Sequence, residues 1–157
     1  MSQETFCVER SALIDATPAE IATLIEDFRR WVAWSPFDKM DPAAERAYSG
    51  ASKGVGAVYE YSGRKAGAGR MEISEVRVDG IRIKLEFLKP FRASNTADFL
   101  LEPEGEGTRV TWAMHGRKTL ISKLMGVFVN ADQFLGKEFE KGLADLKRLA
   151  EAAPATA

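Results

Sequence analysis

The sequence has very little of the two residue types that most often hold metals or form covalent links. Its 157 residues include one histidine, His115, and one cysteine, Cys7. A lone cysteine excludes an internal disulfide, and no cluster at ligand spacing predicts a metal site. We expect Cys7 to be a small buried hydrophobe in a strand. The alternation around His115 predicts a solvent-facing imidazole rather than a catalytic base.

A strong charge bias and long apolar runs are also missing. The formal net charge is −1, which argues against nucleic acid, because a partner of that kind requires a basic surface. The first residues lack the basic region and apolar run of a signal peptide. The apolar stretch LISKLMGVFV contains Lys123 and is too short to span a membrane. We therefore expect a cytoplasmic protein without stable membrane insertion, and the sequence does not predict its oligomeric state.

Two glycine-rich segments do not have the features of nucleotide-binding loops. GASKGVG and GRKAGAG neither follow a strand and open a helix nor end in the Walker Gly-Lys-Ser/Thr. Hairpin turns explain both segments, so we expect no cofactor.

Length and composition suit one globular domain. Hydrophobic residues make up 45% and charged residues 29% of the chain, a balance typical of globular proteins. A domain of this size buries roughly 70% of the surface that its unfolded chain exposes. We expect one domain over residues 1–153 and a frayed tail at 154–157.

The first part of the chain predicts a strand and then a short helix. The strand is expected at residues 5–16. Thr17, Pro18 and Glu20 then provide an N-cap, a favoured first helical residue and a capping box. Apolar residues follow at helical spacing up to Phe28.

The rest of the chain predicts a sheet and a long helix. Residues 43–116 alternate apolar and polar in successive strands, and Asp79-Gly80 indicates a hairpin. One apolar face per strand predicts an antiparallel sheet covered on one side. Residues 120–153 have a helical apolar stripe, with a kink expected near 130–133. We predict an α+β fold: a curved antiparallel sheet of about seven strands around a long C-terminal helix, with two short helices after the first strand.

The stretch RRWVAWSPFDKMDP carries three aromatic residues in a segment that is expected to be largely loop. Trp34 and Phe37 either plug the end of the core or form the rim of a pocket, and both can hold at once. The charged residues Asp38, Lys39 and Asp41 predict that the outer side of this loop faces water.

The chain resembles the SRPBCC, or START-like, superfamily with its helix-grip fold, and is most similar to the polyketide cyclase/dehydrase-like proteins. The segments that carry the resemblance are WSPF, GVGAVYEYSG, GRMEI, LEFLKPF, GTRVTWAMHG and GKEFEKGLADLK. The resemblance implies a hydrophobic cavity between sheet and long helix. Members of the superfamily bind lipids, hormones, polyketides or secondary metabolites; some are aromatase/cyclases, and others bind protein partners.

The candidate ligand-binding residues are those expected to face this cavity or its rim. The aromatic and aliphatic candidates are Trp34, Phe37, Tyr59, Tyr61, Met71, Ile73, Ile83, Leu85, Phe87, Phe99, Trp112, Met114, Met125 and Phe128. Two polar residues, Asn95 and Asp132, share the apolar faces and could orient a polar group of a ligand. The alternatives are a strand end near solvent for Asn95 and the cap of a restarted helix for Asp132.

Three functions fit these features. The first is binding of a small hydrophobic or amphipathic ligand such as a lipid, polyketide or secondary metabolite. The second is a cyclase or dehydratase, which needs an acid or base inside the cavity. The third is a protein-interaction module with a collapsed cavity. Alternation leaves few ionisable groups inside, with Asp132, Glu75 and Arg10 as the exceptions, so binding is favoured and no catalytic residue is assigned.

Overall fold

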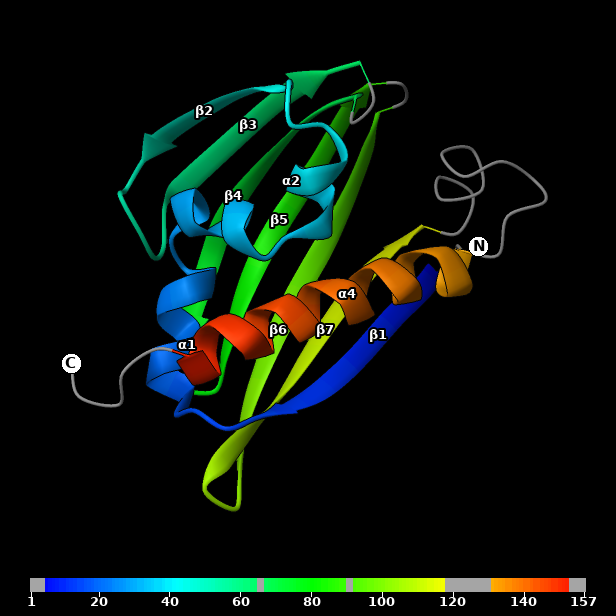
Figure 1. Cartoon of the computed structure of the whole chain (residues 1–157). Helices are drawn as coiled ribbons and strands as arrows, with labels where there is room; N and C mark the ends of the chain where they lie inside the picture. The colour runs from blue at the N-terminus through cyan, green and yellow to red at the C-terminus, as the bar shows by residue number, and fades with distance from the viewer. Residues whose placement is uncertain (1–4, 65–66, 90–91, 118–130, 153–157) are drawn as a thin grey trace.

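The computed structural model describes residues 5–64, 67–89, 92–117 and 131–152. Along the described residues, a strand is followed by three short helical segments, six more strands and a long helix (Figure 1). The elements are β1 (Thr5–Ile14), α1 (Pro18–Ile25), η1 (Phe28–Ala33, a 3-10 helix), α2 (Pro36–Met40), β2 (Glu45–Gly50), β3 (Ala57–Gly63), β4 (Gly67–Arg77), β5 (Gly80–Lys89), β6 (Ala93–Glu104), β7 (Gly107–Arg117) and α4 (Ala131–Ala152).

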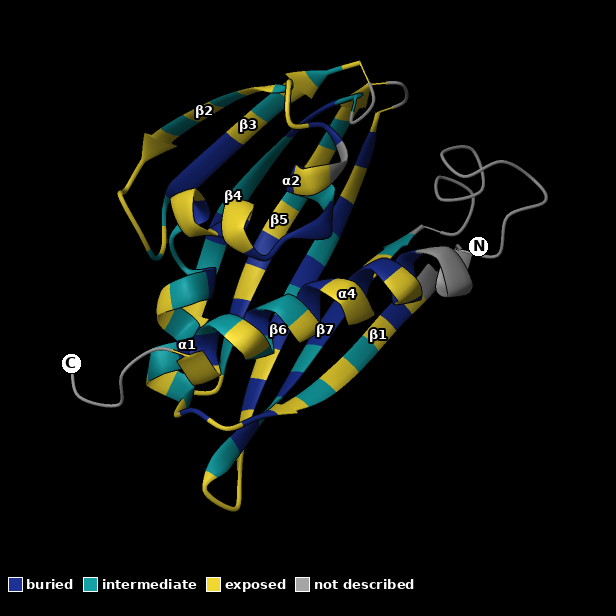
Figure 2. Cartoon of the chain, in the orientation of Figure 1, coloured by how far each residue is buried: buried dark blue, intermediate teal, exposed yellow. Residues whose placement is uncertain are grey.

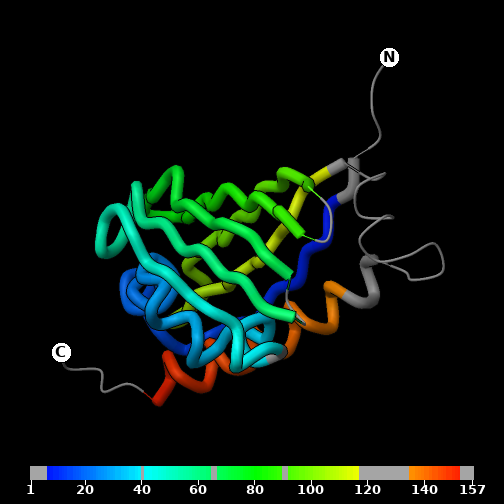
Figure 3. The backbone as a smooth tube through the Cα atoms, turned by 90° about the horizontal axis from the view of Figure 1, so that it is seen from above, coloured from blue at the N-terminus to red at the C-terminus, as the bar shows by residue number. Residues whose placement is uncertain are grey.

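The seven strands form one antiparallel sheet in the order β1-β7-β6-β5-β4-β3-β2. The sheet curves around α4, and the helix crosses the face that we call concave (Figures 1 and 3). This arrangement confirms the predicted helix-grip fold. Residues 120–130 of the predicted long helix lie outside the described residues.

The start of α1 confirms the predicted capping box. The Thr17 hydroxyl accepts a hydrogen bond from the Glu20 amide at 3.2 Å, and the Glu20 carboxylate accepts one from the Thr17 amide at 2.9 Å. Ile21 and Ile25 then point into the core. A cap of this kind stabilises a helix by about 1 kcal/mol, so this short helix has a defined start.

The second half of the tryptophan-rich stretch, which was expected to be loop, forms the short helix α2. Pro36 is tolerated as the first residue of α2, because the first helical position does not need a backbone N–H. The indole of Trp31 donates to the Ile25 carbonyl at 2.7 Å, and that of Trp34 to the Leu24 carbonyl at 3.0 Å. Trp34 is 0% exposed. The two tryptophans therefore close the end of the core beside α1.

Aromatic rings fill the space between sheet and helix on this side. Trp112 of β7 stacks on Phe139 of α4 with ring centroids 4.2 Å apart, and on Phe99 of β6 at 5.0 Å. Gly142 lets α4 approach this closely, since a Cβ there would lie 2.7 Å from the Trp112 ring. Part of the space where a cavity was expected is therefore packed core.

Two expectations about side-chain direction are wrong. Cys7 is exposed, because alternation in β1 turns Val8 inward and Cys7 outward. Glu75 was a candidate for the interior by its parity with Ile73. A register shift between Ile73 and Glu75 reverses that parity, and Glu75 pairs with Arg82 across the ladder.

Candidate functional site

The strand registers align the side chains of the concave face in rows that run across the sheet. One row contains Ile81, Phe99 and Trp112 and is buried under the tryptophans. The next contains Ile73, Ile83, Ala97 and Met114, and all four are buried. Buried and exposed residues alternate along these strands, as Figure 2 shows.

Two further rows, which we call the distal rows, lie beyond these toward the β5–β6 connection. They consist of Tyr59, Met71, Leu85 and Asn95, and of Tyr61, Gly69, Phe87 and Ala93. Four of these side chains are only half-buried: Tyr61, Met71, Leu85 and Phe87. Their neighbours Gly69 and Ala93 are small. The distal rows thus combine partly uncovered apolar surface with two positions that carry small residues.

Tyr61 lies over Gly69. A Cβ at Gly69 would come within 2.5 Å of the Tyr61 hydroxyl and 2.9 Å of the Glu86 carbonyl, so glycine makes room for the phenol. Burial, with the nearby Asp38 carboxylate, raises the pKa of Tyr61 to about 12. The hydroxyl therefore stays protonated at neutral pH and can both donate and accept a hydrogen bond.

Asn95 is the amide side chain in the distal rows, and it is 6% exposed. Its Nδ2 lies 3.9 Å from the Met114 sulfur, which is a weak acceptor. Its Oδ1 is buried without a hydrogen-bond partner among the described residues. The alternative that Asn95 lies near solvent is therefore wrong. A buried carbonyl oxygen without a donor is unusual in a folded protein.

A buried polar cluster joins α2 to the edge of the sheet. The Tyr59 hydroxyl donates to Asp38 Oδ1 at 2.6 Å, and Arg46 Nε lies 3.6 Å from the same oxygen. Arg46 also donates to the Asp38 carbonyl at 2.8 Å and to the Asp41 carbonyl at 3.1 Å. Burial and the hydrogen bond to Asp38 raise the pKa of Tyr59. The cluster holds the end of α2 against β2 and β3.

This cluster corrects the expectation that Asp38 and Asp41 face water, since both are buried. Sequence reasoning missed it because the segment was interpreted as a loop. The signal that could have found it is the helical start at Ser35-Pro36, which places Asp38 in the first turn. Lys39 is exposed as expected, and its ammonium lies 2.7 Å from the Asp145 carboxylate of α4.

The predicted ligand-binding residues separate into three groups. Trp34, Phe37, Phe99 and Trp112 contact one another in the packed aromatic core. The structure brings Tyr59, Tyr61, Met71, Leu85, Phe87 and Asn95 together in the distal rows, with Ile73, Ile83 and Met114 in the row beside them. Met125 and Phe128 lie outside the described residues, and Asp132 is the second residue of α4, with its side chain outside the description.

Arg10 is a candidate interior cation that is engaged elsewhere. Its Nε donates to Glu140 of α4 at 3.0 Å. The guanidinium also occupies the space that a side chain at Gly136 would need, since a Cβ there would lie 2.2 Å from it. Arg10 thus joins β1 to α4.

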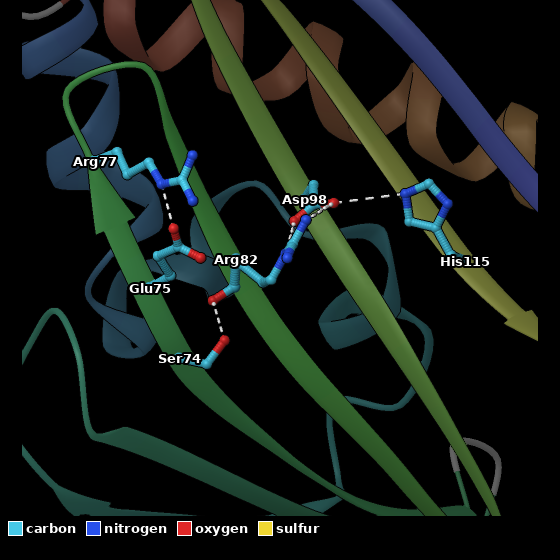
Figure 4. A network of polar contacts seen from close by, with 6 residues as sticks. All are labelled: Ser74, Glu75, Arg77, Arg82, Asp98 and His115. Carbon is cyan, nitrogen blue, oxygen red and sulfur yellow. Dashed lines mark hydrogen bonds and ion pairs between the residues drawn. The ribbon is translucent and has the colours of Figure 1, made fainter.

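A separate polar network covers the opposite, convex face of the sheet (Figure 4). Arg82 Nε donates to Asp98 at 2.8 Å, and His115 Nε2 lies 3.5 Å from the same carboxylate. The His115 side chain is 46% exposed, which confirms that it faces solvent. Glu75 pairs with Arg77 nearby. The exposed Cys7 is the cross-strand partner of His115 in β1.

Metal-binding clusters and membrane-spanning helices are both absent from the described part of the chain. Within it, no group of three or more His, Cys, Asp or Glu side chains could hold a metal ion. Its helices include none that is long and apolar enough to cross a membrane.

Known structures share this fold at low sequence identity. Protein CV1439 from Chromobacterium violaceum is 13% identical with a TM-score of 0.67, over 94% of this chain and 98% of that one. Ara h 8.0201 is 13% identical with a TM-score of 0.60, over 96% of this chain and 100% of that one. The di-domain ARO/CYC BexL of the BE-7585A biosynthetic pathway is 20% identical with a TM-score of 0.65, over 96% of this chain and 51% of that one.

The sequence comparisons identify the family of the chain. No curated protein matches the sequence. The model of the family described as polyketide cyclase / dehydrase and lipid transport matches residues 5–151. This chain, with its seven-stranded sheet curved around a C-terminal helix, belongs to the polyketide cyclase / dehydrase and lipid transport family.

Proposed function

We propose that the protein binds a small hydrophobic or amphipathic molecule, such as a lipid, polyketide or secondary metabolite, on the distal rows of the concave face. The observation that carries the proposal is the partly uncovered apolar surface of Met71, Leu85 and Phe87 beside the unpaired oxygen of Asn95. Apolar side chains on the inner face of a curved sheet are normally covered. A ligand that covers them gains about 25 cal/mol for each Å² of apolar surface removed from water.

Membership of a family described by cyclase, dehydrase and lipid-transport activity supports both binding and catalysis. The buried polar cluster favours binding. Within this cluster, the Asp38 carboxylate is the candidate for a catalytic acid or base. However, the Tyr59 hydroxyl donates a hydrogen bond to it and Arg46 lies beside it. A catalytic acid or base has to reach the proton that it transfers. We therefore assign Asp38 to holding α2 and leave the proposal at ligand binding.

The proposal is tested by ligand-dependent stability. A ligand at one hundred times its dissociation constant stabilises the folded state by about 2.7 kcal/mol. For a chain of this length, we expect the midpoint of thermal unfolding to rise by roughly 5–10 °C. The probes are a panel of naphthalene derivatives and medium-chain alcohols, and native mass spectrometry of the purified protein reports any retained molecule.

A pair of matched variants locates the site. Leu85→Trp places a bulky ring in the distal rows and should abolish the ligand-induced shift without unfolding the protein. Leu100→Trp is the control, because Leu100 is 43% exposed on the next strand and should leave the shift unchanged. No shift with any probe and no retained molecule would contradict the proposal. Severe unfolding of Leu85→Trp alone would mean that this position is packed core.

A further inference from the structure

Asn95 Oδ1 is a buried hydrogen-bond acceptor to which no described residue donates. The residue is 6% exposed, its amide nitrogen faces the Met114 sulfur, and its oxygen has no partner among the described residues. Desolvating an amide oxygen without replacing its water hydrogen bond costs free energy that a partner can recover. A ligand group at this point is therefore favoured if it donates a hydrogen bond.

The surroundings of this oxygen are apolar. Asn95 pairs with Leu85 across the ladder, and Leu85 pairs with Met71. Both of these side chains are half-buried. A ligand that reaches the oxygen would therefore lay its hydrocarbon part along Leu85 and Met71, and would bring one donor to the asparagine.

The charges near the distal rows are unfavourable for an anion. The Asp38 carboxylate lies close enough to Tyr61 to help raise the pKa of its hydroxyl. The described cations nearest the concave face have partners: Arg46 lies against Asp38 and backbone carbonyls, Arg10 pairs with Glu140, and the Arg29 guanidinium lies 4.7 Å from the centroid of the Tyr48 ring. A ligand carboxylate placed here would lose its hydration without a countercharge from the described residues, which is costly.

We infer that the ligand is an uncharged molecule that presents a hydroxyl or amide N–H donor to Asn95 Oδ1, and that the site discriminates against carboxylates. The inference rests on the proposed function, since it specifies the chemistry of the same site. It distinguishes alcohols, phenols and amides from fatty acids, from ethers, which only accept hydrogen bonds, and from plain hydrocarbons.

Three probes with one ring system separate these classes. 2-Naphthol has a donor hydroxyl and is neutral at neutral pH, 2-methoxynaphthalene has the same oxygen without the donor, and 2-naphthoate carries a charge. We expect the wild-type protein to bind 2-naphthol about five to ten times more tightly than 2-methoxynaphthalene, the contribution of one neutral hydrogen bond. Binding of 2-naphthoate should be at least about tenfold weaker than that of 2-naphthol.

Two variants test the role of the asparagine. Asn95→Leu keeps a similar volume but removes the acceptor, so the ratio of the two neutral affinities should fall to about one while 2-methoxynaphthalene still binds. Thr96→Val is the control, because Thr96 is the next residue of β6 and points to the other face. It should keep the wild-type ratio. Titration calorimetry measures all of these affinities.

The outcomes separate the inference from the proposed function. Equal affinities of the wild-type protein for 2-naphthol and 2-methoxynaphthalene, or tightest binding of 2-naphthoate, would overturn the inference while the site itself stands. An unchanged ratio in Asn95→Leu would also overturn it. Failure of all three probes to bind would contradict the proposed function as well. If Asn95→Leu does not fold, the wild-type ratios still decide.

Discussion

Removing one hydroxyl from the buried cluster tests whether Asp38 holds α2 on the sheet. Tyr59 is 3% exposed, and its hydroxyl donates to Asp38 Oδ1 at 2.6 Å. Tyr59→Phe deletes this hydrogen bond and leaves the ring in place against Phe28, whose centroid is 5.8 Å away. The carboxylate keeps Arg46 at 3.6 Å but loses its hydroxyl donor.

The size of the effect follows from the charge of the acceptor. A hydrogen bond to a charged group contributes about 1.5–3 kcal/mol to stability. The substitution creates almost no cavity, so we expect the free energy of unfolding to fall by about 2 kcal/mol, and the midpoint of thermal unfolding by roughly 4–8 °C. Denaturant unfolding followed by circular dichroism measures the first quantity, and calorimetry measures the second.

Tyr48→Phe is the matched control. Tyr48 stacks beside Tyr59 with centroids 5.3 Å apart, and its hydroxyl makes no hydrogen bond to any described residue, so we expect a change below about 0.5 kcal/mol. A double-mutant cycle of Tyr59→Phe with Asp38→Ala should give a coupling energy of at least about 1 kcal/mol. A loss below about 0.5 kcal/mol for Tyr59→Phe, or additive effects in the cycle, would refute the reasoning.

Three further predictions concern other contacts. Gly142→Ala should lower the free energy of unfolding by about 1–3 kcal/mol and shift tryptophan fluorescence, because the added methyl meets the Trp112 ring; an unchanged stability would contradict the close approach of α4. The raised pKa of Tyr61, about 12 against an ordinary 10.0, predicts stability that is full below pH 10 and falls toward pH 12, since the unfolded state ionises first. Denaturant titrations at several pH values should show that Tyr61→Phe reduces the slope of the unfolding free energy against pH by about 1.4 kcal/mol per pH unit. Equal slopes for the variant and the wild-type protein would contradict the raised pKa of Tyr61. Lys39→Met should lower the free energy of unfolding by less than about 1 kcal/mol, because the ion pair of Lys39 with Asp145 is exposed. A larger decrease, measured by chemical unfolding, would show that the pair anchors α2.

The sheet and α1 could be predicted from local patterns. Strict alternation in residues 81–87 places Ile81 and Ile83 inside, and the Thr17 capping box sets the start of α1. Such signals depend only on near neighbours in the sequence. No local pattern in the sequence indicates the register shift before Glu75. Alternation therefore predicted the wrong face of the sheet for Glu75.

The candidate site could be predicted only in part. Alternation places Leu85, Met71 and Asn95 on one face, but it does not say which rows the aromatic core fills. That depends on Trp31 and Trp34 folding back over β6 and β7, a contact between distant segments. The burial of Asp38 has the same origin, because its partners Tyr59 and Arg46 come from later strands.

The most direct measurement is an NMR titration of methyl-labelled protein with 2-naphthol. If the distal rows bind the ligand, the methyl signals of Met71, Leu85 and Met114 and the side-chain amide of Asn95 should shift together and saturate. The methyl signals of the exposed Leu13 and Val78 should stay unchanged. Saturable shifts confined to these exposed residues, or no shifts at all, would contradict a ligand site on the concave face.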